Sequence, residues 1–205
     1  MMKQFVAPRA LRGRPRQFEH GEVVERAMDA FWSNGYNGTS LPALLDATKM
    51  SRGSLYGAFG DKHGLFLLAL DRYIADALAR VDVELDAREG AMAGLRVFLS
   101  GYVDRTSGVA GKRGCLVVAT AMELVAQDME VARRIRRFFQ AMEQKIGVAF
   151  ERANAQGELA ERVDPASAAR AMLRMVEGLR VVGKTGVERA VQQSTVDALL
   201  DRFSK

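Results

Sequence analysis

The segment that begins at Ser51 carries side chains able to hydrogen-bond to the edges of bases and to phosphates. Arg52 can donate two hydrogen bonds to the edge of guanine, a contact worth ~1–3 kcal/mol of discrimination between bases. Ser54 and Tyr56 can reach base edges or phosphates from the same turn. If a helix starts at Ser51, its free backbone N–H groups also attract phosphate. These residue types point to contact with DNA.

Helical spacing divides this segment into a buried face and an exposed face. At 100° per residue, Leu55 and Phe59 lie on one side and face the core. The opposite side carries Ser54 and two glycines, Gly53 and Gly57, so that the helix backbone can approach DNA closely. Alternatively, the glycines merely weaken the helix, by ~0.5–1 kcal/mol each relative to alanine.

Short helices upstream must position this segment. The apolar spacing predicts a first helix from about Phe18–Asn34. Thr39 or Ser40 caps a second helix, and Pro42 lies in its first turn, where a missing N–H costs nothing. Lys49–Met50 forms the turn before the third helix. Two short helices joined by a tight turn form a helix-turn-helix, which places its second helix in the major groove.

Residues 1–16 form a basic segment of their own. They hold five basic residues and no acidic residue; subtracting these five from the 30 Lys and Arg leaves 25, equal to the 25 Asp and Glu. The net charge of +5 therefore lies in this segment. We expect a flexible arm that binds the DNA backbone or minor groove through Arg12, Arg14 and Arg16. A solvated terminus without a binding role is the alternative.

The rest of the chain also has helical spacing, and no stretch shows the strict alternation of a strand. Asp128 is expected to cap a long helix, and Thr195 to cap the last one. The glycine-rich residues 106–114 are expected to form a loop. Beyond the third helix, the expected helices are about 62–80, 89–105, 115–126, 128–154, 165–184 and 195–203. The fold class is therefore all-α, with a three-helix DNA-binding domain at 17–62 and a second helical domain at 63–205.

Several motifs of the first third occur together in one known family. They are FWSNGY at Phe31–Tyr36, Thr39-Ser40, MSRGSLY at Met50–Tyr56, Phe59, Asp61-Lys62 and Gly64-Leu65-Phe66. Over about Phe18 to Leu70, the chain closely resembles the TetR family of bacterial repressors. This resemblance implies a homodimer that binds a palindromic operator. It also implies release when a small-molecule effector enters a C-terminal ligand-binding and dimerisation domain. The residues that match the usual DNA contacts of the family are Thr39, Ser40, Ser51, Arg52, Gly53, Ser54, Tyr56 and Lys62.

Three positions depart from the family pattern. Lys49 stands in the turn where glycine is usual, which predicts a strained or adjusted turn. Leu45 replaces a small residue. Gly57-Ala58 replaces an aromatic or polar residue followed by histidine, which removes a common phosphate contact.

Apolar residues of the second domain are candidates for the effector pocket. Six of the ten methionines follow residue 90, which suits an adaptable apolar pocket, although ordinary core filling explains them equally well. We expect the last two helices, around Met172–Val182 and Val196–Phe203, to pair across the dimer axis as a four-helix bundle. The candidate ligand-binding residues are Phe98, Tyr102, Cys115, Leu116, Met122 and Phe138.

Cys115 is the only cysteine, so no internal disulfide can form, and we expect a reducing cytoplasm. It follows Lys112 and Arg113 at the start of an expected helix, and both a helix N-terminus and nearby cations favour the thiolate. This context predicts a sensor of electrophiles or oxidants. The alternative is a small buried packing residue, the usual role of a free cysteine.

Other patterns support different classes of function less well. Gly178–Thr185 matches the phosphate-loop pattern G-x-x-x-x-G-K-[ST], which would indicate a nucleotide hydrolase, but no strand is expected before it. A non-specific DNA-packaging protein is another alternative. No catalytic constellation, metal-ligand spacing or cofactor motif stands out, so we expect no enzyme activity and no cofactor. The apolar runs are too short to cross a membrane.

Overall fold

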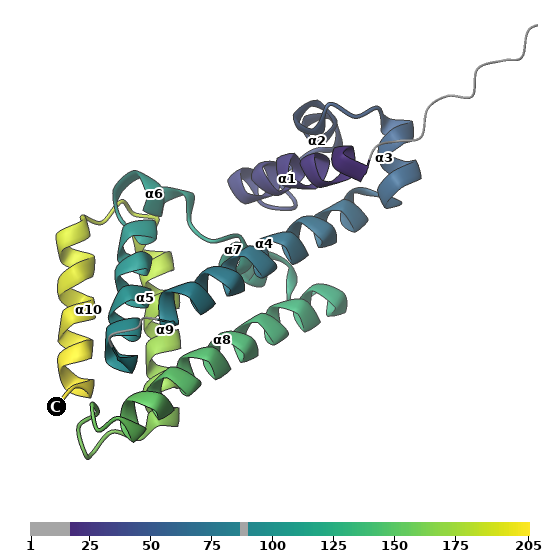
Figure 1. Cartoon of the computed structure of the whole chain (residues 1–205). Helices are drawn as coiled ribbons and strands as arrows, with labels where there is room; N and C mark the ends of the chain where they lie inside the picture. Colours follow the sequence, from purple (N-terminus) through teal and green to yellow (C-terminus); the bar gives the residue numbers. More distant parts are fainter. Residues whose placement is uncertain (1–16, 87–89) are drawn as a thin grey trace, which may run out of the picture.

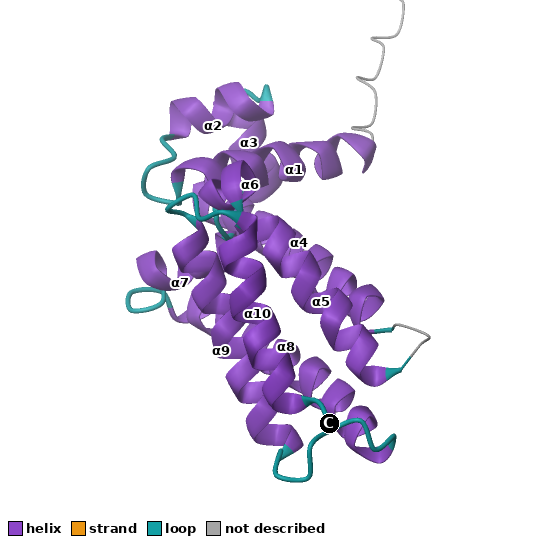
Figure 2. Cartoon of the chain, turned by 90° about the vertical axis from the view of Figure 1, so that its left-hand side faces the viewer, coloured by secondary structure: helices purple, strands orange, loops and turns teal. Residues whose placement is uncertain are grey.

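The computed structural model describes residues 17–86 and 90–205, and these residues form helices joined by short loops, without a strand (Figures 1 and 2). A single antiparallel bridge joins Leu159 to Ser204. The helices are α1 (Gln17–Asn34), α2 (Leu41–Thr48), α3 (Arg52–Phe59), α4 (Lys62–Leu85), α5 (Ala91–Thr106), α6 (Gly108–Arg113), α7 (Leu116–Leu124), α8 (Met129–Ala155), α9 (Pro165–Gly183) and α10 (Arg189–Phe203). The predicted all-α fold is confirmed.

Capping side chains fix where the helices near the N-terminus begin. The Ser40 hydroxyl accepts a hydrogen bond from the Ala43 N–H at 3.2 Å and starts α2. The Ser51 hydroxyl accepts one from the Ser54 N–H at 3.1 Å and starts α3. Such caps stabilise a helix by ~1 kcal/mol, because they satisfy N–H groups that have no partner within the helix.

The turn between α2 and α3 has the strain that its sequence predicts. Lys49 lies in the left-handed region, with φ of 56° and ψ of 31°, and no other non-glycine residue among those described has a positive φ. The Met50 N–H donates to the Leu45 carbonyl at 3.1 Å and closes the turn. A residue with a Cβ therefore occupies a conformation that glycine adopts more readily.

Helices α1 and α3 pack on α4, and α2 packs on α1. Phe31, Leu44, Leu55 and Phe66 come from the four helices and are fully buried. The rings of Phe31 and Phe66 meet edge to face with centroids 5.1 Å apart. Helix α4 then continues into the second group of helices, so one rod belongs to both parts of the molecule (Figure 1).

The second group of helices shares one apolar core. The predicted stripe of α8 is buried along its whole length, from Val131 to Phe150. Helix α8 packs against α9, α4 and α5, and α5 also contacts α10. Among the described helices, none combines the length and the apolar character that crossing a bilayer requires.

Several predicted boundaries were wrong. Residues 106–114, expected as a loop, contain α6, which packs against α9; a Cβ on Gly111 would meet the Gly183 carbonyl oxygen at 2.8 Å. Helix α10 starts after Glu188, and the Thr195 hydroxyl donates to the Val191 carbonyl inside it, so Thr195 is not the cap. Helix α4 runs five residues beyond residue 80 because its apolar face continues through Val81 and Leu85.

Candidate DNA-binding surface and effector site

Helix α3 presents the exposed face that its spacing predicts. Leu55 is fully buried, whereas Arg52, Ser54 and Tyr56 are exposed. A Cβ placed on Gly53 or Gly57 would meet no other atom within 4 Å, so these glycines leave open space above the helix backbone. The Ser51 and Ser54 hydroxyls lie 2.8 Å apart and share a hydrogen bond. The face can therefore admit a flat or convex partner close to its backbone.

The other predicted DNA contacts differ in their exposure. Ser40 and Ser51 are exposed caps; the Ser40 hydroxyl keeps a hydrogen to donate, whereas the Ser51 hydroxyl shares a hydrogen bond with Ser54. The Lys62 ammonium lies 4.2 Å from the centre of the Tyr36 ring, and burial lowers its pKa. Arg12, Arg14 and Arg16 lie outside the described residues.

Thr39 does not belong on the exposed surface. Only 1% of it is exposed, and its hydroxyl donates to the Gly35 carbonyl at 2.6 Å. This hydrogen bond fixes the loop between α1 and α2, so the structure contradicts a direct side-chain contact with DNA.

The predicted ligand-binding residues separate into a buried set and one surface residue. Phe98, Tyr102, Leu116 and Phe138 have at most 2% of their surface exposed, and Cys115 has 5%. Met122 is 86% exposed, which contradicts its placement in an internal pocket. It lies on the face of α7 opposite to the buried residues Leu116, Thr120 and Leu124.

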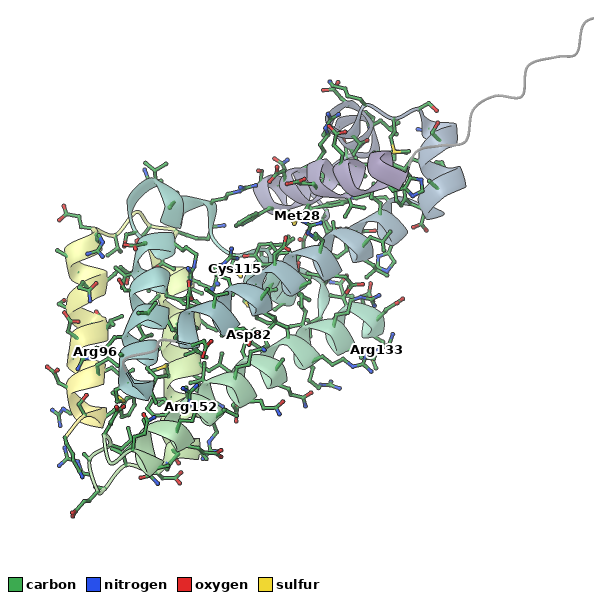
Figure 3. The ribbon with its side chains drawn as sticks, in the orientation of Figure 1. Met28, Asp82, Arg96, Cys115, Arg133 and Arg152 are labelled. Atoms are coloured by element: carbon green, nitrogen blue, oxygen red, sulfur yellow. The ribbon has the colours of Figure 1, made fainter. Side chains whose placement is uncertain are left out.

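Cys115 lies at the junction between α7, α4 and α1 (Figure 3). The Tyr73 hydroxyl, on α4, donates to its sulfur at 3.4 Å, and burial raises the pKa of Tyr73. Arg113 does not turn towards the thiol: it forms an ion pair with Asp29 and stacks on the Trp32 ring at 3.8 Å, both on α1. Arg113, which was expected beside the thiol, therefore links the C-terminal domain to α1 instead.

Four important side chains were missed as site residues, and only Arg180 left a clear signal in the sequence. Trp32, Tyr73, Glu123 and Arg180 connect helices that are distant in the sequence. Arg180 follows Val176 by four residues and shares its buried face, so the signal was a charge on an apolar stripe. Glu123 ends an apolar run, and its partners are the backbone N–H groups of residues 36 and 37, which side-chain patterns do not reveal.

The phosphate-loop interpretation of Gly178–Thr185 is wrong. Residues 178–183 form the end of α9, and no strand precedes them in the part of the chain that the structure describes. A phosphate loop needs its backbone free ahead of a helix, and here the backbone is already paired within one.

Comparisons with known proteins agree with this geometry. Residues 23–69 match the family described as bacterial regulatory proteins, tetR family, and residues 91–198 match the tetracyclin repressor-like C-terminal domain. The HTH-type transcriptional regulator YezE of Bacillus subtilis, described as uncharacterized, is 30% identical over 92% of this chain and 97% of its own length. The HTH-type transcriptional repressor ComR of Escherichia coli is 26% identical over 85% of this chain and 84% of its own.

A solved structure also superposes on the whole fold. It is a cysteine mutant of the TetR family transcriptional regulator CifR with 26-base-pair operator DNA, and it is 33% identical with a TM-score of 0.80. The likeness covers 93% of this chain and 100% of that one. With both family domains matched in order and a helix-turn-helix exposed at one end, this chain belongs to the TetR family of bacterial regulatory proteins.

Proposed function

We propose that this protein is a homodimeric repressor that binds a palindromic DNA operator in the cytoplasm and releases it when a small molecule binds the C-terminal domain. The exposed face of α3 carries the proposal, because Arg52 and Ser54 stand beside glycines that let the backbone reach base edges. The CifR structure was solved with 26-base-pair operator DNA, which supports operator binding by this fold.

The outer faces of α9 and α10 support a dimer. Both helices pack against α5, which leaves their other sides exposed. Val181, Val182 and Val191 are each at least half exposed, and a Cβ on Gly178 would meet no other atom within 4 Å. Small and apolar residues on two adjacent helices fit a four-helix bundle with a second copy. Two recognition helices would then lie ~34–36 Å apart, one turn of DNA.

A chain of contacts can carry a signal from the C-terminal domain to α1. The Trp32 indole N–H donates to the Gly114 carbonyl at 3.1 Å, and its ring meets Tyr73 edge to face at 4.8 Å. Tyr73 in turn holds Cys115. A group that displaces Tyr73 or residues 113–115 must therefore move α1 or α4. The protein then has two conformations, with and without this displacement, and an effector acts by binding one of them more tightly than the other.

We propose an electrophile as one class of effector, since the single thiol lies within this chain of contacts. In an addition to an activated double bond, the Cys115 sulfur forms a bond to carbon and the π bond opens. The thiol proton passes to the neighbouring carbon. The added group needs volume where Cys115 is 95% buried, so it would force the adjacent tyrosine aside.

A gel shift tests the proposal with DNA from upstream of the protein's own coding region, against random DNA as competitor. Retention of the upstream DNA against competitor supports a repressor, and equal binding of both DNAs would identify a packaging protein. Arg52→Ala should relax specificity at one base pair by ~10–100-fold, whereas Arg136→Ala, an exposed control on α8, should not.

The electrophile is tested with a thiol-blocking reagent in the same gel shift. Release of the DNA by the wild type, but not by Cys115→Ser, supports an electrophilic effector; retention of the DNA by both proteins contradicts it.

A further inference from the structure

Arg180 brings a positive charge into the interior of the C-terminal domain. It is 9% exposed and reaches from α9 towards α5, where its guanidinium carbon lies 4.6 Å from the centre of the Tyr102 ring. Cys115 and Tyr73 lie near enough to interact with its charge. Four helical elements therefore converge on one buried cation.

No anion among the described residues matches this cation at hydrogen-bonding distance. Arg180 Nε has no hydrogen-bond partner, and the nearest carboxylate oxygen, on Glu177, is 3.9 Å away. Both carboxylate oxygens of Glu177 are themselves without a partner, and burial raises the pKa of this residue despite the nearby Arg180. Arg105, which stacks on the same tyrosine ring, is instead paired with Glu84.

Such an arrangement is costly unless a ligand completes it. A buried charge without a close partner loses its hydration and regains little from the protein. Tyr102 lies beside Arg180, and its hydroxyl can donate a hydrogen bond to an anion, whereas the Tyr73 hydroxyl already donates to Cys115. One positive charge whose nearest carboxylate oxygen is 3.9 Å away, beside a hydroxyl donor, fits a group of one negative charge.

We propose that Arg180, together with Tyr102, forms a subsite for the carboxylate of a small effector. The carboxylate replaces the stacking of the guanidinium on Tyr102 and accepts hydrogen bonds from the arginine. Its chain then lies beside Cys115, next to the contacts that lead to Trp32. This inference rests on the proposed function only in taking the bound carboxylate to be the effector.

The test uses the full-length protein without DNA and compares butanoate with the uncharged butanamide. Binding is followed by melting temperature and by the fluorescence of Trp32, the only tryptophan, which packs on Tyr73. At a tenfold excess over Kd, butanoate should raise the melting temperature of the wild type by about 3–5 °C. Butanamide should leave it unchanged.

Two variants separate the subsite from a merely structural arginine. Arg180→Met should fold, because it fills similar volume without an unmatched charge, and should lose the response to butanoate; Arg180→Lys keeps the charge and should retain a weaker response. Glu177→Gln removes the competing carboxylate and should bind butanoate more tightly. An equal response in the wild type and Arg180→Met, or no response of the wild type at millimolar butanoate, would overturn the proposal. Because this assay contains no DNA, its outcome does not depend on whether the protein binds an operator, and the two proposals can fail independently.

Discussion

The Glu123 carboxylate, at the end of α7, accepts a hydrogen bond from the Tyr36 backbone N–H at 2.9 Å. Its other oxygen accepts one from the Asn37 N–H at 2.6 Å. A side chain of the C-terminal domain thus holds the loop that leads into the helix-turn-helix.

Replacing this carboxylate should loosen the connection between the two domains. Hydrogen bonds to a charged group contribute ~1.5–3 kcal/mol, so Glu123→Ala should lower the melting temperature by several degrees. It should also weaken the release of operator by effector, measured by gel shift. Glu151→Ala, at an exposed position of α8, is the control and should change neither quantity. Unaltered release in Glu123→Ala would show that the signal travels by another route.

Gly57→Ala should have opposite effects on folding and on DNA binding. Alanine at an exposed helical position without close neighbours favours the helix by ~0.5–1 kcal/mol, so the melting temperature should rise. The added methyl group stands between α3 and the groove and should weaken operator binding. Gly21→Ala, on α1, has equally open surroundings and should gain stability without losing affinity. Tighter binding by Gly57→Ala would argue against a close approach of α3 to DNA.

Gly178→Glu should convert the proposed dimer into monomers. The protomer has room for the side chain, whereas a bundle of α9 and α10 with their partners would bury two like charges. Molar mass from light scattering should therefore fall by half at micromolar protein. Gly21→Glu introduces the same charge away from this face and should remain dimeric. A dimeric Gly178→Glu protein would place the interface elsewhere.

Glu177 should make stability depend on pH. Burial raises its pKa in the folded chain, and the charge of Arg180 lowers it by a smaller amount. The folded state then holds the proton more tightly than the unfolded state, so this residue stabilises the fold below its unfolded pKa. That stabilisation is lost as pH rises through the folded pKa. Glu177→Gln, measured by urea unfolding, should gain stability over the wild type as pH rises from about 4 to about 8. A constant difference across this range would contradict the assignment.

Local patterns predicted the DNA-binding end of the molecule well. The caps at Ser40 and Ser51, the strained Lys49 and the buried Leu55 depend on neighbours within four residues, and the structure confirms each of them. In each of these cases, both interacting groups lie in the same short stretch of sequence.

The proposed effector site was harder to foresee because its contacts join distant segments. Tyr73 meets Cys115 from 42 residues away, and Trp32 donates to Gly114 from 82 residues away. Met122 and Thr39 show the same limit: Met122 was expected in the pocket as an apolar residue and Thr39 on the DNA-binding surface from the family resemblance, but tertiary packing decided the exposure of each. The start of α10 was missed because Thr195 can hydrogen-bond within a helix as readily as cap one.

Helix α4 has 24 residues without a break, which gives a rod about 36 Å long. A tilt of only about 5° at one end displaces the other by about 3 Å, close to the rise of about 3.4 Å between neighbouring base pairs. A change in the angle of α4 that is small enough to keep the helices packed would thus shift its far end by about one base pair along the double helix.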